Sequence, residues 1–303
     1  MSNFLSPDQK KRADFFICDV FDSYKDDSAS MEHPVFSLST KPDHRMLVYQ
    51  SNGNTIKIKP SYTGLATIHD KDILLYLTSC LIKAKSNGEK ISHRVRFTAH
   101  DYLTSTNKTI NGKSYLQLTE GLERLSGTRI ETNIQTNDAE IMSEFGLIDQ
   151  WRVVKEGKDG RMAGVEVVLS EWFYNSIRGN SVLSIDKDYF KLRKPTERRL
   201  YELARKNCSE QLSWEIQLEV LKEKLGSSSP LNKLRFNIKK IAETNHLPEY
   251  NIEINDDIIL FTRKQHLPAT TVQPLEAQHS LDEFNDDSEL NGRFYAIKKA
   301  LGR

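Results

Sequence analysis

Two stretches decide the predicted fold: YLQLTEGLERL at residues 115–125 and LNKLRFNIKKI at residues 231–241. Each has apolar residues at intervals of three, four and three: Tyr115, Leu118, Leu122 and Leu125 in one, and Leu231, Leu234, Ile238 and Ile241 in the other. This spacing puts the apolar side chains on one face of a helix that packs on a core. A short helix and a turn precede each stretch, and a strand follows it, at residues 129–134 and 251–255. The repeat predicts two winged helix-turn-helix units.

The first predicted unit spans residues 31–180. A hairpin is expected between Met46 and Ile58, because Asn52-Gly53 is a strong signal for a tight turn. The loop at residues 156–161 is expected to be a wing with basic residues at its tip. The other predicted elements are a strand at 35–38, a helix at 70–85, a strand at 95–97, a helix at 99–103, the long helix at 113–125, and strands at 128–135, 151–155 and 164–169.

The second predicted unit spans residues 181–264. Pro195 is suited to the first turn of a helix, and Gly226 ends another. The expected elements are a strand at 182–185, a helix at 195–207, a strand at 214–216, a helix at 218–225, the long helix at 230–245, and strands at 251–255 and 258–263.

The charge distribution separates a basic core from two acidic ends. Residues 1–30 and 265–303 each carry four basic and six acidic residues. The remaining 35 basic and 30 acidic residues give the core a net charge of +5, although the whole chain carries only +1. The expected fold class is therefore α+β, with two tandem winged helix-turn-helix domains between flexible acidic tails. A short helix is expected at residues 290–301.

Composition excludes several classes of protein. The three cysteines, Cys18, Cys80 and Cys208, lie far apart and form no metal-binding spacing. No apolar run approaches the ~20 residues of a membrane span, and the N-terminus lacks the order of a signal peptide. We expect a cytoplasmic protein that uses no metal and no cofactor and does not contact a membrane.

Polar residues on the far side of the two long helices are the candidates for base recognition. Arginine, glutamine, asparagine and lysine can bond purine edges in the major groove, and glutamate can accept from cytosine. A solvated helix face is the commoner explanation for one such pattern, but its occurrence on two helices favours recognition of DNA. The candidates are Lys113, Gln117, Glu120 and Arg124 on the first helix, and Lys233, Asn237 and Lys240 on the second.

Other basic residues are candidates for phosphate contacts, which fix the register of a protein on DNA. They fall in the expected wing, around the helix at 195–207, and beside the second recognition helix. They are Lys155, Lys158, Arg161, Arg193, Lys194, Arg198, Arg235 and Lys239.

No catalytic residue is assigned. Gly112-Lys113-Ser114 resembles the end of a phosphate-binding loop, but Asn107 stands where that motif needs glycine. An origin nickase would need two histidines one residue apart, and the eight histidines contain no such pair. We therefore expect no enzymatic activity. A dimeric repressor, an origin-nicking endonuclease and a protein-binding scaffold remain open as alternatives.

Several ordered motifs between residues 31 and 264 resemble the plasmid replication initiator protein A family of bacteria. They are PVFSL at 34–38, ATIHDKDIL at 66–74, RFT at 96–98, TRIETNI at 128–134, IDQW at 148–151, VLSEWFY at 168–174, IDKDYF at 185–190 and RLYELARK at 199–206.

The resemblance implies a replicon-encoded initiator that binds direct repeats at an origin and recruits the host initiator and replicative helicase. Related initiators bind repeats as monomers and repress their own promoters as dimers, so a monomer–dimer equilibrium is expected. Some relatives carry a glutamine-containing motif that docks on a sliding clamp. Here the nearest stretch, Ala13-Asp14-Phe15-Phe16, lacks the glutamine and departs from that pattern.

Overall fold

The computed structural model describes residues 15–18, 34–51, 54–136, 139–156, 161–178, 182–208 and 211–264. The expected acidic tail at 265–303 and its helix at 290–301 lie outside the described residues. No described helix is long and apolar enough to cross a lipid bilayer.

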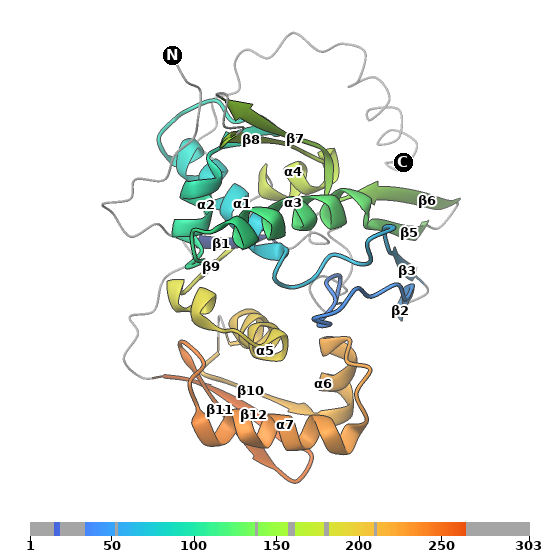
Figure 1. Ribbon diagram of the computed structural model, residues 1–303. Helices are drawn as coiled ribbons and strands as arrows, with labels where there is room; N and C mark the ends of the chain where they lie inside the picture. The colour runs from blue at the N-terminus through green and yellow to red at the C-terminus, as the bar shows by residue number, and fades with distance from the viewer. Residues whose placement is uncertain are drawn as a thin grey trace.

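The first half of the chain contains three helices and a three-stranded antiparallel sheet, here called unit 1 (Figure 1). The strands lie in the order β4-β8-β7, so the last strand in sequence is the central one. The elements are α1 (Lys71–Ser86), β4 (Arg94–Phe97), α2 (Ala99–Ser105), α3 (Gly112–Gly127), β7 (Ile148–Glu156) and β8 (Arg161–Leu169).

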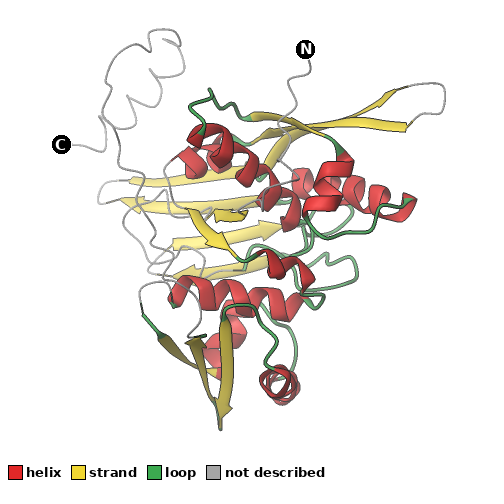
Figure 2. Cartoon of the chain, turned by 90° about the vertical axis from the view of Figure 1, so that its left-hand side faces the viewer, coloured by secondary structure: helices red, strands yellow, loops and turns green. Residues whose placement is uncertain are grey.

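The second half, unit 2, repeats this order of elements. Its sheet has the order β10-β12-β11, again with the last strand at the centre. These three strands lie at the bottom of the molecule in both Figure 1 and Figure 2. The elements are α5 (Pro195–Asn207), β10 (Ser213–Gln217), α6 (Leu218–Leu225), α7 (Leu231–Thr244), β11 (Tyr250–Asn255) and β12 (Ile258–Arg263).

A separate four-stranded sheet interrupts unit 1. Its order is β2-β3-β5-β6, where β2 is Leu47–Ser51, β3 is Asn54–Lys59, β5 is Arg129–Thr136 and β6 is Ala139–Gly146. The strand predicted after α3 is present as β5, but it belongs to this separate sheet, so its expected equivalence to the strand after α7 is wrong. Across the β3–β5 pair, the Lys57 ammonium lies 2.7 Å from the Glu131 carboxylate. This ion pair helps to hold β5 on β3. The strand orders β4-β8-β7 and β10-β12-β11 make β7 the counterpart of β11.

The N-terminal segment also differs from expectation. Residues Phe15–Cys18 form β1, which pairs with β9 (Val182–Ile185), a strand that the sequence placed at the start of the second unit. The expectation of a wholly flexible segment at 1–30 is therefore wrong for these four residues. Three further elements were not anticipated: β6, the helix α4 (Glu171–Arg178) and a short 3-10 helix at Lys187–Lys191. The strand predicted at 35–38 is reduced to a single bridge between Ser37 and Thr67.

The apolar stripes behave as the sequence predicts. Leu118, Leu122 and Leu125 on α3 are at most 2% exposed, and Leu234, Ile238 and Ile241 on α7 are at most 4% exposed. The Asn111 side chain accepts a hydrogen bond from the Ser114 amide and thereby caps α3. Buried side chains of both units form one continuous hydrophobic cluster, so the repeated units share a core.

Candidate nucleic-acid interface

The exposed face of α7 is strongly basic. Residues 231–244 contain four basic residues and one acidic residue. Lys233, Lys239 and Lys240 are all exposed, and none of them forms an ion pair with a residue in the described part of the chain. Their positive charge is therefore available to an anionic partner. The sequence placed these three lysines correctly on the solvent side of the helix.

Two further candidates on α7 are less available. Arg235 Nη2 lies 2.6 Å from a carboxylate oxygen of Asp257, which itself is half exposed. Asn237 is partly buried.

The same face of α7 also carries an exposed aromatic ring. The Phe236 ring is 56% exposed, and the Lys240 ammonium lies 4.4 Å from its centroid.

The corresponding face of α3 carries a different charge. Lys113, Gln117 and Glu120 are exposed as predicted, and Glu123 is exposed beside them. With two carboxylates and one ammonium group, this face is weakly acidic. It therefore suits a nucleic-acid surface less well than α7 does.

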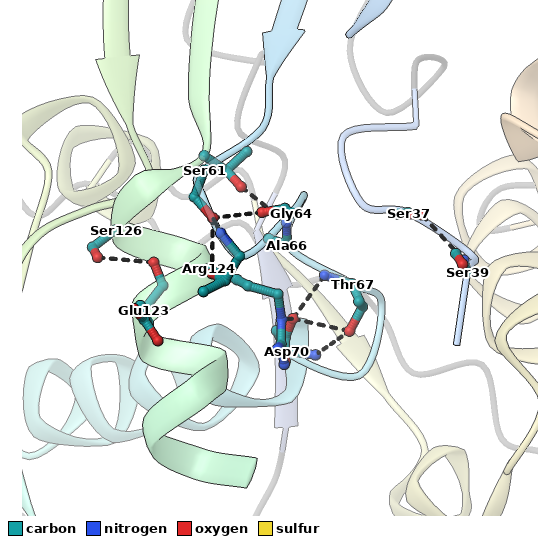
Figure 3. Close-up of polar contacts among 12 residues, drawn as sticks. Ser37, Ser39, Ser61, Gly64, Ala66, Thr67, Asp70, Glu123, Arg124 and Ser126 are labelled. Atoms are coloured by element: carbon teal, nitrogen blue, oxygen red, sulfur yellow. Dashed lines mark hydrogen bonds and ion pairs between the residues drawn. The ribbon is translucent and has the colours of Figure 1, made fainter. Parts of the chain in front are cut away.

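Arg124 does not extend into solvent, which corrects its assignment as a base contact. Its Nε and Nη2 atoms donate to the two carboxylate oxygens of Asp70, each at 2.7 Å (Figure 3). This bidentate hydrogen bonding raises the pKa of Arg124 despite its partial burial. The same carboxylate accepts from the Thr67 amide at 2.8 Å. Arg124 therefore joins α3 to the start of α1, because a fork of two donors matches a carboxylate.

Arg198 is the second predicted contact that the structure corrects. Its side chain is 2% exposed, so it cannot reach a phosphate while the protein is folded. Arg198 Nη1 donates to Asp72 at 2.5 Å, and its Nε donates to the Leu192 carbonyl at 2.8 Å. Lys108 supplies a second cation to Asp72 at 2.7 Å. Buried carboxylates need such partners, since an unpaired charge in the core is costly.

A second buried carboxylate continues this network. Glu202 accepts from the Tyr189 hydroxyl at 2.8 Å and lies 2.9 Å from the Lys71 ammonium and 3.3 Å from Arg199. Burial alone would raise the pKa of Glu202, but the charges of Lys71 and Arg199 hold it below its usual value. The network is structural, because it lies between α1 and α5 and has almost no access to solvent.

The remaining predicted phosphate contacts fall into two groups. Arg193 and Lys194 are exposed, and Lys194 forms an ion pair with Glu197 at 2.8 Å. In the wing, Lys158 lies outside the described residues. Lys155 lies near the end of β7 and Arg161 at the start of β8, on either side of that loop.

Sequence reasoning missed a basic cluster on the outer face of the unit 1 sheet. Arg94 and Arg96 on β4 and Arg152 on β7 all contact the Glu166 carboxylate on β8. Each arginine is 46–59% exposed, whereas Glu166 is only 3% exposed. Although burial opposes ionisation, the three guanidinium groups lower the pKa of Glu166 to about 2. The cluster therefore keeps a net charge of +2.

A signal for this cluster was present in the sequence. The run Arg94-Val95-Arg96-Phe97 alternates charged and apolar residues, which is the pattern of a strand with one face in the core. Val95 and Phe97 are fully buried. The two arginines must therefore share the opposite face, although their carboxylate partner is 72 and 70 residues away in the chain.

The described ranges contain no group of three or more histidine, cysteine or carboxylate side chains placed to hold a metal ion. Cys80 and Cys208 are buried free thiols, and burial raises the pKa of Cys208 to about 11. Neither thiol has the low pKa of a reactive cysteine.

Two comparisons with known proteins both match replication proteins. Residues 25–252 match the family model of replication initiator protein A. A curated protein of Wigglesworthia glossinidia brevipalpis, named "Putative replication protein", is 41% identical over 263 residues, which cover 84% of this chain and 95% of that protein.

Solved structures show where the fold has been seen before. Two crystal structures of domains 2 and 3 of RctB align with TM-scores of 0.59 and 0.56. Each alignment covers 77% of this chain and 96% of the RctB chain, at 12% and 13% sequence identity. At this identity the likeness concerns the fold alone.

Proposed function

The chain belongs to the replication initiator protein A family, and from that premise we propose that it binds duplex DNA sequence-specifically as a replication initiator. The observation that carries the proposal is the exposed face of α7, with Lys233, Lys239 and Lys240 free of ion pairs with described residues. Duplex DNA is a dense polyanion, and lysines that neutralise its phosphates release bound counterions.

The repeated order of elements supports two winged helix-turn-helix modules, with α3 and α7 as their recognition helices. In this arrangement a recognition helix lies in the major groove, and two modules in tandem read faces about 10 base pairs apart. We assign the larger contribution to DNA recognition to α7. On α3, Lys113, Gln117 and Glu120 remain candidates for base contacts, while Arg124 holds the helix in place. Lys155, Lys158 and Arg161 in the wing, with Arg193 and Lys194, are the proposed phosphate contacts.

In the proposed role, several copies bind direct repeats at the origin of a plasmid or similar replicon. Binding energy opens a neighbouring A·T-rich segment, where flexible steps lower the cost of deformation. Opened DNA then receives the host initiator and the replicative helicase. Binding of a dimer at the gene's own promoter represses its expression. No step in this scheme requires enzymatic chemistry.

A footprint of the purified full-length chain on the DNA that flanks its own gene tests the proposal. The titration is run at two salt concentrations, because phosphate contacts make affinity depend steeply on salt. Regularly spaced protection, about two helical turns per site, is the expected result. A single protected palindrome would assign the protein to the dimeric repressors. Absence of salt-dependent protection would overturn the proposal, and strand-specific nicking in Mg²⁺ or Mn²⁺ would overturn its non-enzymatic form.

A further inference from the structure

An aromatic side chain lies in the middle of the basic face of α7. Phe236 is 56% exposed, although the apolar stripe of the same helix is buried. Its near neighbours on the exposed side are Lys233, one turn before it, and Lys240, one turn after it. A single exposed apolar side chain needs no partner of its own. Phe236 is set apart by its place among exposed lysines on the helix face that is proposed to bind DNA.

The surroundings of Phe236 argue against a protein partner that binds through apolar contacts. Docking grooves for protein helices are lined by several apolar side chains in contiguous rows. Of the four exposed residues one turn away from Phe236, three are lysines (Lys233, Lys239 and Lys240) and the fourth is the polar Asn232. No other large apolar side chain on α7 is as exposed. The patch therefore combines one apolar contact with positive charge, which complements a polyanion that displays isolated apolar groups.

The major groove of DNA is such a surface. Its only apolar group is the 5-methyl of thymine, and phenylalanine is among the side chains that contact it. Phe236 is the sixth residue of α7 and lies in the N-terminal half of the helix. The N-terminal residues of a recognition helix are those that reach base edges.

The Lys240 ammonium contacts the ring. It lies 4.4 Å from the ring centroid, within the range of a cation–π contact. A held ring loses less conformational freedom on binding than a mobile one. Lys240 can approach a phosphate or a guanine at the same time, because an ammonium group has three donors.

We propose that Phe236 is a specificity-determining residue that contacts the 5-methyl group of one thymine in the major groove read by α7. The inference rests on the proposed DNA-binding function and adds the base and the atom that one side chain recognises.

The test uses the full-length chain and the duplex that it selects from a random-sequence library. In that duplex each thymidine is replaced singly by deoxyuridine, which removes only the methyl group. For the wild-type chain, one position should lose about fourfold in affinity, the factor that corresponds to ~0.8 kcal/mol for one buried methyl group. The Phe236→Ala variant should bind thymine and uracil equally at that position.

Leu212→Ala is the matched control, because Leu212 is an exposed apolar residue of unit 2 that lies outside α7, at 78% exposure. It should retain the full uracil effect. Unchanged thermal unfolding of Phe236→Ala would show that the variant is folded.

Each outcome decides the proposal. Indifference of the wild-type chain to every uracil, or an unchanged uracil effect in Phe236→Ala, overturns the thymine contact and leaves DNA binding standing. Failure to enrich any duplex from the library would overturn the proposed function, and the thymine contact with it.

Discussion

Asp72 on α1 and Arg198 on α5 form a buried ion pair, 2.5 Å long, between residues 126 positions apart in the chain. Neither side chain is more than 2% exposed. The pair connects the first helix of unit 1 to the first helix of unit 2, inside the hydrophobic cluster that both units share. The two units therefore form one folded body, and α3 and α7 are held in a defined relation.

Arg198→Met should lower the free energy of unfolding by about 3–5 kcal/mol, because it leaves the buried Asp72 carboxylate with Lys108 as its remaining ion-pair partner among the described residues. Urea denaturation measures the loss. Lys191→Met is the control, since Lys191 pairs with Asp188 at the surface and its loss should cost less than ~1 kcal/mol. Equal effects of the two substitutions would contradict the structural role of the pair.

Glu166→Gln should make stability less sensitive to acid. The folded-state pKa of Glu166 is lowered from 4.5 to about 2, so its contribution is complete above about pH 4.5 and is lost as the pH falls toward 2. The variant should therefore be less stable than the wild type at pH 7, and the difference should narrow between pH 4.5 and 2. Chemical denaturation at several pH values measures it. A difference that is constant over this range would show that Glu166 is not the titrating group.

Arg124→Ala should reduce stability by about 1–3 kcal/mol without changing the preferred DNA sequence. The substitution removes both guanidinium donors from Asp70, whose side chain is 7% exposed. Urea denaturation and selection from a random-sequence library give the two readouts. Lys113→Ala, at an exposed position on the same helix, should leave stability unchanged. An altered sequence preference with intact stability would restore Arg124 as a base contact.

Replacing Lys233, Lys239 or Lys240 by glutamine should weaken DNA binding and reduce its salt dependence. Each lysine that neutralises one phosphate contributes about 0.9 to the slope of log affinity against log salt concentration. The triple variant should therefore lose roughly three units of slope in a fluorescence anisotropy titration. Lys41→Gln, an exposed change in the first half of the chain, should have no effect. An unchanged slope in the triple variant would exclude α7 from the interface.

Gly226→Ala should lower stability by more than the backbone penalty alone. Gly226 has a φ of +63° at the end of α6, and an added Cβ would lie 2.5 Å from Cγ of Pro34. Gly88 provides the control, because its φ is +74° and nothing lies within 4 Å of an added Cβ. Gly88→Ala should cost about 1 kcal/mol, the left-handed conformation alone. Thermal unfolding of both variants measures the difference, and equal losses would argue against close packing of Pro34 on α6.

The repeated apolar stripes were sufficient to predict both long helices, because the periodicity of a helix is local information. Pro195 and Gly226 marked helix ends for the same reason, and α5, α6 and β12 have the bounds expected from the sequence. The exposed lysines of α7 followed from the stripe alone, since residues opposite a buried face are in solvent.

Pairing between distant segments could not be predicted in this way. Both Arg124 and Arg198 look like surface cations in the sequence, and each is held by a distant carboxylate at the N-terminal end of α1. The strand β5 has the same composition whether it joins the unit 1 sheet or another sheet. Its place beside β3 depends on partners that only the folded chain brings together.

The sequence by itself determined which segments are helices and strands, where the chain repeats, and which face of each long helix is apolar, since these properties depend on residues a few positions apart. The tertiary structure alone decided which cations remain free. An arginine is available to DNA only if no carboxylate pairs with it. For Arg124 and Arg198 this depends on partners that lie 54 and 126 positions away in the chain. The tertiary structure left α7 basic, paired Arg124 of α3 with a carboxylate, and joined the two units into one body.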